Sequence, residues 1–385
     1  MSRRKVCVVT GSRADYGLLF WPMRLLQEDP DFELQTVVTG MHLAPEFGST
    51  WEQVADDGFP ISARVEMLLS GDSAVALSKS LGLGVISFAD TLAELVPDLM
   101  LVLGDRFEIL AAVQSALFAR LPVAHLCGGD LTEGAFDDAI RHAITKMSHI
   151  HFVTNAKSER RLHLMGEDPA QVHCVGSPGL DYINRTKWLT RQAFFDAVRL
   201  RPRGRNIVVT FHSATLEPEK AVDQLQALLD ALDDLPDVGL IMTGSNADTE
   251  GRGLMQRMAE FAGTRENAVF SPSLGQNLYL NALKHADCVV GNSSSGLYEA
   301  PTFGIPTVNV GDRQSGRLKA ASVIDCAPEH DEISAALNKA FSLDCSNVQN
   351  PYGDGNSAPR IVAALKAIED PTALVRKRFH EFRVR

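Results

Sequence analysis

The sequence predicts an α/β protein built from two doubly wound domains that face a central cleft. Short apolar runs, bounded by glycine or polar turns, alternate with longer segments of helical periodicity. The 385-residue chain is longer than one ordinary hydrophobic core supports. The alternation also stops once, at a polar stretch, and then starts again. Alternating strands and helices form parallel sheets that are buried on both faces.

The first series of apolar runs predicts an N-terminal domain over residues 1–183. Its strands are expected at residues 5–10, 34–39, 99–103, 123–127, 151–154 and 172–175. Between them lie segments such as residues 109–120, whose apolar side chains recur at helical spacing. In doubly wound sheets, ligands bind at the carboxyl ends of the strands, so side chains that follow these runs are candidates for a site.

A polar, arginine-rich stretch at residues 184–205, with Pro202 and Gly204, is the candidate joint between the domains. A second series then predicts a C-terminal domain over residues 205–359. Its strands are expected at residues 207–211, 239–242, 268–270, 288–290 and 307–310. A long helix at residues 360–379, within the segment 360–385, is expected to return to the first domain.

Composition narrows the function classes. The net charge of −11 argues against a nucleic-acid footprint. We find no stretch that approaches the ~18 apolar residues of a membrane span, and the basic start followed by a four-residue apolar run indicates a strand rather than a signal peptide. The six cysteines form no CxxC pair, which favours reduced, mostly structural thiols. A cytoplasmic protein without a nucleic-acid or membrane partner is expected.

Two charged turns follow strands of the first domain. The turn Gly11 to Gly17 opens a helix, whose N-terminal N–H groups favour an anion with Arg13 as a clamp, although an ordinary strand-to-helix turn has the same pattern. Asp105, Arg106 and Glu108 follow another strand, and they indicate either site residues or a local ion pair.

The densest set of titratable side chains follows the predicted strand 123–127. It comprises His125, Asp130, Glu133, Asp137, Asp138, Arg141 and His142. Asp137, Arg141 and His142 fall on neighbouring faces of one predicted helix. His149 and His151 lie nearby, but their spacing matches no metal motif, so acid/base work by carboxylates is favoured and neither a metal nor a cofactor is expected.

Polar residues also follow strands of the second domain. His212 and Asn246 come after two of them, and Arg313 comes after a third. The turn Gly291 to Gly296 contains Ser293 and Ser294 and precedes a helix, a pattern that favours a phosphate cradle. Glu299, expected about two turns into that helix, is a candidate acceptor for ribose hydroxyls.

Seven of these motifs together resemble the hydrolysing UDP-N-acetylglucosamine 2-epimerases, over about residues 5–324. They are Gly-Ser-Arg-Ala-Asp-Tyr-Gly at 11–17, Gly-Asp-Arg at 104–106, Gly-Gly-Asp at 128–130, Ile-Arg-His-Ala-Ile-Thr-Lys at 140–146, Val-Gly-Ser-Pro-Gly at 175–179, Gly-Asn-Ser-Ser-Ser-Gly at 291–296 and Gly-Asp-Arg-Gln at 311–314.

The resemblance implies a GT-B-like fold and conversion of UDP-N-acetylglucosamine and water into N-acetylmannosamine and UDP, by elimination to a glycal and hydration. Such enzymes begin sialic-acid-type pathways, and a homo-oligomer, dimer or tetramer, is expected. The implied catalytic residues are Asp105, Arg106, Glu133, Asp137 and His142. The implied nucleotide contacts are Arg13, His212, Asn246, Ser293, Ser294, Glu299 and Arg313. Sugar contacts are expected from Asp130, Arg141 and Asp181.

One position departs from the family pattern. The family often has His or Glu where this chain has Cys127. This difference makes Glu133 a stronger candidate for an acid/base group. Three other readings stay open: the same reaction on UDP- or GDP-2,4-diacetamido-2,4,6-trideoxyglucose, a glycosyltransferase of the same architecture, and a nucleotide-sugar sensor without catalysis.

Overall fold

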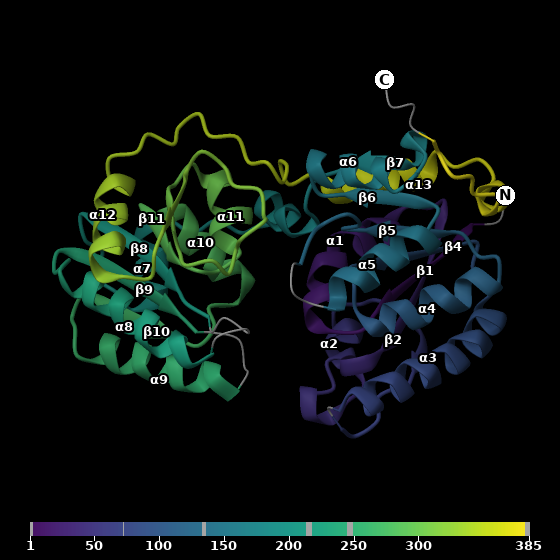
Figure 1. The fold of residues 1–385 in the computed structure, drawn as a ribbon, viewed down its shortest axis with the longest axis horizontal. Coiled ribbons are helices and arrows are strands. Elements are labelled where there is room, and N and C mark those ends of the chain that lie inside the picture. The colour runs from purple at the N-terminus through teal and green to yellow at the C-terminus, as the bar shows by residue number, and fades with distance from the viewer. Residues whose placement is uncertain (1–2, 72, 133–135, 213–217, 245–248, 382–385) are drawn as a thin grey trace. The chain divides into compact units, whose positions relative to one another are not determined.

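The fold is described from a computed structural model, which describes residues 3–71, 73–132, 136–212, 218–244 and 249–381. The chain forms two compact units (Figure 1). Unit 1 comprises residues 1–184 and 352–385, and unit 2 comprises residues 185–351. Each unit holds one parallel sheet with flanking helices, as the sequence predicts.

The sheet of unit 1 has seven strands in the order β3-β2-β1-β4-β5-β6-β7. The strands are β1 (Arg4–Thr10), β2 (Phe32–Thr39), β3 (Ile61–Val65), β4 (Leu99–Leu103), β5 (Val123–Leu126), β6 (Ile150–Val153) and β7 (Val172–Cys174). The order turns at β1, because β2 lies on one side of it and β4 on the other. Ligands bind doubly wound sheets at such a switch point, so the turns after β1 and β4 are the first place to look for a site.

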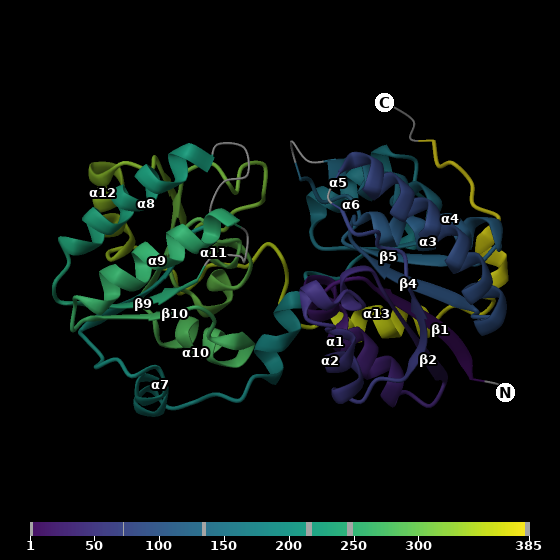
Figure 2. The same cartoon turned by 90° about the horizontal axis from the view of Figure 1, so that it is seen from below.

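Helices cover both faces of this sheet (Figure 2). They are α1 (Arg13–Glu28), α2 (Trp51–Asp56), α3 (Ala74–Leu95), α4 (Phe107–Phe118), α5 (Phe136–Met147), α6 (Ala156–Leu164) and α13 (Ser357–Lys366), with short 3-10 turns at Gly40–His42, Pro45–Phe47, Pro169–Gln171, Pro178–Arg185 and Pro371–Val375. Side chains of β1 alternate between the two faces: Val6 and Val8 pack with α1 and α13, whereas Cys7 and Val9 pack with α3 and α4. Because both sets of side chains are buried, the strands have unbroken apolar sequences.

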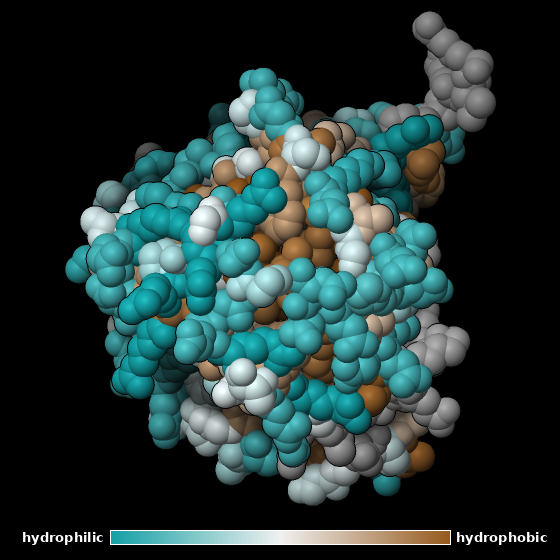
Figure 3. Space-filling model, turned by 90° about the vertical axis from the view of Figure 1, so that its left-hand side faces the viewer, coloured by the Kyte–Doolittle hydropathy of each residue, from teal (hydrophilic) through white to brown (hydrophobic). Residues whose placement is uncertain are grey.

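Unit 2 has a six-stranded parallel sheet in the order β10-β9-β8-β11-β12-β13. The strands are β8 (Arg205–Thr210), β9 (Val238–Thr243), β10 (Ala268–Ser271), β11 (Cys288–Gly291), β12 (Thr307–Val310) and β13 (Val323–Cys326). Its helices are α7 (Arg191–Val198), α8 (Pro218–Asp233), α9 (Thr249–Gly263), α10 (Gly275–His285), α11 (Ser295–Tyr298) and α12 (His330–Ala340), with a 3-10 turn at Ala300–Phe303. Residues of α8, α9 and α12 share one apolar cluster with the sheet. Figure 3 shows a face of this unit on which hydrophilic side chains predominate and hydrophobic ones form a limited patch, as is normal for a protein surface.

The structure corrects the expected end of the second domain. Residues 352–359 belong to unit 1, because the N–H of Ser177 donates to the carbonyl of Tyr352 (2.7 Å) and α13 already begins at Ser357. The expected helix over residues 360–379 is also too long. The helix ends at Lys366, and Pro371 starts a separate 3-10 turn whose first N–H groups are capped by Asp370.

The expectation about membrane-length stretches is likewise corrected by α3. This 22-residue helix is long and apolar enough, by length and composition, to cross a membrane, although Lys79, Asp90 and Glu94 interrupt its apolar sequence. Two of its four buried residues, Phe88 and Leu92, belong to the same apolar cluster as those of α4. The residues other than these four are exposed or half-buried.

Candidate functional site

In the turn after β1, the position expected for an anionic ligand is taken by a carboxylate of the protein. The buried carboxylate of Asp15, in the first turn of α1, accepts hydrogen bonds from the N–H of Gly11 (2.8 Å), the hydroxyl of Thr10 (3.0 Å) and the hydroxyl of Ser12. These donors are therefore occupied by a side chain of the protein. Arg13, the predicted anion clamp, is the first residue of α1, and its side chain is exposed.

His42 is a buried partner of this turn that the sequence analysis missed. Its Nε2 lies 3.0 Å from the hydroxyl of Thr10, and its Nδ1 lies 2.8 Å from the hydroxyl of Thr50. Since the Thr10 hydroxyl gives its proton to Asp15, Nε2 of His42 is the donor in the first contact. Burial lowers the pKa of His42, and the charge of Asp15 opposes that shift. The feature that could have indicated His42 in the sequence is its position three residues after the end of β2.

The turn after β4 forms the ion pair that the sequence analysis considered. Arg106 donates to both carboxylate oxygens of Glu108, from Nε at 3.2 Å and from Nη2 at 3.0 Å. Glu108 is completely buried, and burial raises its pKa while Arg106 opposes the shift. A Cβ on Gly40 would lie 2.7 Å from Cγ of Glu108, so glycine there gives this carboxylate its space. Asp105 is not part of this pair.

Arg141 of α5 holds Asp105 instead. Its Nη2 pairs with Asp105 and donates to the hydroxyl of Thr132 (2.9 Å), while its Nη1 donates to the carbonyl of Asp130 (2.8 Å). The guanidinium thus joins the turns that follow β4 and β5 through charge-assisted hydrogen bonds. Its burial and this set of partners make it the centre of the candidate site in unit 1.

Asp137 lies one turn before Arg141 on the same helix, and its carboxyl group is half-buried. Burial raises the pKa of Asp137, and the nearby charge of Arg106 opposes the shift. Asp137 therefore lies on the helix whose Arg141 pairs with Asp105, and two carboxyl groups in such different surroundings are suited to proton transfer. His142 is near Asp138 (Nε2 to Oδ2, 3.5 Å), and burial lowers the pKa of this histidine.

The expected sugar contact Asp130 has structural partners of its own. The carboxylate of Asp130 accepts hydrogen bonds from the hydroxyls of Thr154 (2.8 Å) and Ser158 (2.5 Å). Asp130 therefore contacts both the turn after β6 and the helix α6. Cys127, in the same loop, has a left-handed backbone (φ 62°), and burial raises the pKa of its thiol. A neutral thiol is a poor substitute for the acid/base group that the family often has there.

Asp181 is a correction to the predicted sugar contacts. Its side chain is fully buried, and its two oxygens accept from the N–H groups of Ser357 (2.7 Å) and Ala358 (2.5 Å). It therefore caps the N-terminus of α13 and is closed to a ligand. The predicted residues Glu133 and Asn246 lie outside the residues that the structure describes.

In unit 2, Asn292 connects three of the polar turns. Its side chain accepts from the N–H of His212 (2.7 Å) and donates to the carbonyl of His212 (2.8 Å). Its carbonyl accepts from the side chains of Arg313 (3.1 Å) and Gln314 (2.8 Å). The ends of β8, β11 and β12 are thereby held together, and His212 and Arg313 lie on the same edge of the sheet. The sequence analysis assigned no role to Asn292.

Glu299 does not lie two turns into a helix, because α11 is only four residues long and Glu299 follows it directly. Ser293 and Ser294, at the start of this short helix, are half-buried. Behind them the hydroxyl of Tyr279 contacts that of Ser295. Among the described residues, Oε2 of Glu299 is a buried acceptor without a hydrogen-bond donor, and burial raises the pKa of Glu299 to about 7.

This raised pKa predicts a pH-dependent gain in stability for Glu299→Gln. The folded protein binds a proton more tightly than the unfolded chain, so the contribution of Glu299 is most favourable below pH 4.5 and is lost as the pH rises to about 7. Gln stays neutral, so we expect the variant to exceed the wild type at pH 8 by up to about 3 kcal/mol, with no gain at pH 4.5. Urea unfolding at the two pH values measures this, with exposed Glu266→Gln as the control. An equal difference at both pH values would contradict the assignment.

The chain matches the family model of UDP-N-acetylglucosamine 2-epimerase over residues 24–366. It is 36% identical over 345 residues to the Campylobacter jejuni GDP/UDP-N,N'-diacetylbacillosamine 2-epimerase (hydrolyzing), covering 89% of each chain. It is 34% identical over 365 residues to the Legionella pneumophila UDP-N,N'-diacetylbacillosamine 2-epimerase (hydrolyzing), covering 95% of this chain and 96% of that one. A UDP-N-acetylglucosamine 2-epimerase of Neisseria meningitidis is 32% identical over 374 residues, with 96% of each chain covered.

Solved structures have the same fold. The putative UDP-N-acetylglucosamine 2-epimerase of Listeria monocytogenes superposes with a TM-score of 0.78 at 18% identity, covering 95% of this chain and 97% of that one. The Neisseria meningitidis UDP-GlcNAc 2-epimerase bound to UDP-GlcNAc gives a TM-score of 0.75 at 18% identity, covering 94% and 100%. With the family match over most of the chain, these likenesses show that the protein belongs to the UDP-N-acetylglucosamine 2-epimerase family, whose members are nucleotide-sugar 2-epimerases of GT-B-like fold.

Proposed function

We propose that the protein is a hydrolysing 2-epimerase that acts on a nucleotide-linked 2-acetamido sugar and releases the nucleotide. The observation that carries this proposal is the pair of carboxyl groups in unit 1. Asp105 forms an ion pair with Arg141, whereas Asp137 is half-buried and burial raises its pKa. Inversion at C2 requires one group to remove a proton and another to deliver one, and two carboxyl groups in different surroundings can take these two roles.

The reaction balances with water as the only co-reactant. A carboxylate, which we assign to Asp105, takes the C2 proton while the C1–O bond to the nucleotide breaks, and the product is a glycal. Water then adds its hydroxyl to C1, and C2 receives a proton from the opposite face, which we assign to Asp137. Glu133 stays a candidate for either transfer.

Nucleotide binding is assigned to unit 2. Arg313 and His212 supply positive or donor groups for phosphate, and Ser293 and Ser294 supply hydroxyls at the start of α11. The unsatisfied buried oxygen of Glu299 is the acceptor that a ribose hydroxyl would satisfy. Arg13, whose side chain is exposed, and Asn246, which lies outside the described residues, stay predicted nucleotide contacts.

For the sugar, we favour the 2,4-diacetamido-2,4,6-trideoxyglucose skeleton of N,N'-diacetylbacillosamine, linked to UDP or GDP. The relatives with 36% and 34% identity carry that substrate in their names. UDP-N-acetylglucosamine, the substrate expected from the sequence, is the second candidate, because a relative with 32% identity is named for it. N-Acetylmannosamine as product and a sialic-acid-type pathway depend on that second candidate.

Proton NMR in D2O tests both the reaction and the sugar. We expect each accepted nucleotide sugar to yield free nucleotide and a free manno-configured sugar that carries deuterium at C2, with faster turnover of the diacetamido sugar. Retention of the original C2 proton would reject the elimination mechanism. Binding without turnover of either sugar would identify a sensor, and turnover only with an added acceptor would identify a transferase.

A further inference from the structure

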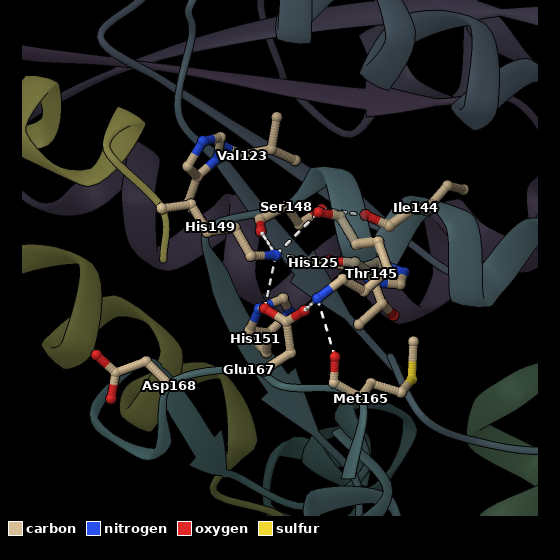
Figure 4. A network of polar contacts seen from close by, with 12 residues as sticks. Val123, His125, Ile144, Thr145, Ser148, His149, His151, Met165, Glu167 and Asp168 are labelled. Atoms are coloured by element: carbon tan, nitrogen blue, oxygen red, sulfur yellow. Dashed lines mark hydrogen bonds and ion pairs between the residues drawn. The ribbon is translucent and has the colours of Figure 1, made fainter. Parts of the chain in front are cut away.

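A buried carboxylate in unit 1, away from the proposed proton-transfer groups, collects donors from three segments of the chain. Glu167, in the loop after α6, is almost completely buried. Its oxygens accept from Nε2 of His151 (2.9 Å), from Nζ of Lys146 (2.6 Å) and from Nζ of Lys377 (2.6 Å). Figure 4 shows this network around Glu167, with His151 on one side of it and the last turn of α5 on the other.

Lys377 comes from the C-terminal segment, more than 200 residues beyond the helix that it contacts. Its ammonium group lies 2.6 Å from the carbonyl of Ser148, 2.9 Å from that of Lys146 and 3.3 Å from that of Thr145. These carbonyls lie at and just beyond the C-terminal end of α5, where the usual helical donors run out, and that of Thr145 also accepts the N–H of Ser148 (3.1 Å). The three N–H donors of the ammonium thus face four acceptors, these carbonyls and Glu167, of which the carbonyl of Thr145 is the most distant.

The charges in this cluster compensate one another. A cation is favoured at the C-terminal end of a helix dipole, and Glu167 balances its charge where water is largely excluded. Burial would raise the pKa of Glu167, but the donors of His151 and of the two lysines outweigh burial and hold it at about 2. Burial lowers the pKa of Lys377, and the contact with Glu167 opposes that shift.

The helix that Lys377 caps is the one that carries the candidate catalytic groups. Asp137 and Arg141 lie in its first half, and Lys377 contacts its last turn. A second connection starts in the last turn of α5, where the hydroxyl of Thr145 contacts Nδ1 of His125 (3.2 Å). Nε2 of His125 in turn donates to the carbonyl of Gly104 (2.8 Å), the residue before Asp105. Burial lowers the pKa of His125 to about 3, so this neutral histidine is a fixed link.

The contacts of the neighbouring tail residues make Lys377 separable from the tail as a whole. The ring of Phe379 packs on Gly166, where a Cβ would lie 2.3 Å from it. The N–H of His380 donates to the carbonyl of Gly166 (2.9 Å). The tail is therefore held on its loop by contacts that do not involve the ammonium group.

We propose that Lys377 is a positioning residue: clamped by Glu167, it fixes the end of α5 and thereby the place of Asp137 and of the Asp105–Arg141 pair. The inference depends on the proposed function for its effect on turnover, and on the fold alone for its effect on the helix. A displacement of the catalytic groups by a distance smaller than an atom is enough to lower the rate of an oriented proton transfer strongly.

The test compares Lys377→Met, Lys377→Arg and the exposed neighbour Arg378→Met in the full-length protein. We expect Lys377→Met to lower kcat roughly tenfold with KM and UDP affinity nearly unchanged. Lys377→Arg, which keeps charge and donors, should restore most of kcat, and Arg378→Met should behave as the wild type. In an Asp137→Asn background, Lys377→Met should lower kcat by less than about twofold, because both changes act on one step.

Hydrogen exchange supplies a readout that needs no substrate. We expect faster exchange in the α5 amides of residues 140–148 in Lys377→Met, and no change in Arg378→Met. Wild-type kcat in Lys377→Met, or a loss of kcat that Arg does not restore, would overturn the inference. Unchanged exchange in α5 would overturn it too, even in an active enzyme. Faster exchange in a protein whose wild type turns over no nucleotide sugar would support the clamp and reject the proposed function.

Discussion

Asp137→Asn is expected to lower kcat by a factor of roughly 10² or more while UDP affinity stays nearly constant. Asn keeps the shape of the side chain but cannot take or give a proton. Burial raises the pKa of Asp137, and perturbed pKa values of this kind are frequent among groups that transfer protons in enzymes. Steady-state turnover of the accepted nucleotide sugar, beside calorimetry with UDP, measures the two quantities separately.

Two variants serve as controls for this result. Asp90→Asn, on the exposed surface of α3, removes a carboxylate outside the site and should leave turnover unchanged. Glu299→Ala should show the opposite pattern and weaken UDP binding by about 1–3 kcal/mol, because ribose donors lose their acceptor. If Asp137→Asn lost UDP affinity as severely as Glu299→Ala, or kept near-normal turnover, the division of roles between the two units would be wrong.

Most of the sheet could be predicted because its central strands are buried on both faces and read as apolar runs. The two missed strands lie at sheet edges. Ile61–Val65 contains Ser62 and Arg64, whose side chains are exposed, and Val323–Cys326 contains the exposed Asp325. An edge strand contacts only one neighbouring strand and is partly open to water, so its sequence carries no continuous apolar signal.

The site was predictable to the extent that strand ends mark it. Asp105, Arg106 and Arg141 could be selected because charged residues after buried strands gather at one edge of a parallel sheet. The resemblance led to a sugar-contact role for Asp181, whose partner Ser357 is 176 residues away, since a helix cap and a ligand contact look alike in sequence. Lys377 gave no signal at all, because one lysine in a polar tail is typical of a solvated segment.

The largest expected effect on stability is that of Gly291→Ala. Gly291 ends β11 with φ 129°, a conformation that side chains rarely adopt, and a Cβ there would lie 1.9 Å from the carbonyl oxygen of Thr210 in the neighbouring strand β8. Backbone cannot rotate away as a flexible side chain can, so the two strands must separate. We expect a loss of about 3 kcal/mol or more, measured by urea unfolding.

Two other glycines of unit 2 separate the clash from the conformational strain. Gly311, at the end of β12, has φ 76° and open space around its Cβ position, so Gly311→Ala carries the strain alone and should lose about 1 kcal/mol. Gly263, at the end of α9, has open space and no left-handed backbone, so Gly263→Ala should be neutral or stabilising. From the most to the least stable, the expected order is therefore Gly263→Ala, Gly311→Ala, Gly291→Ala.

Gly291→Ala should also weaken UDP binding in the fraction that folds, because Asn292 follows Gly291 directly and holds His212, Arg313 and Gln314. A Gly291→Ala variant as stable as Gly311→Ala would show that the strand end tolerates a Cβ, and the close approach of β8 and β11 would then not be what fixes these polar turns.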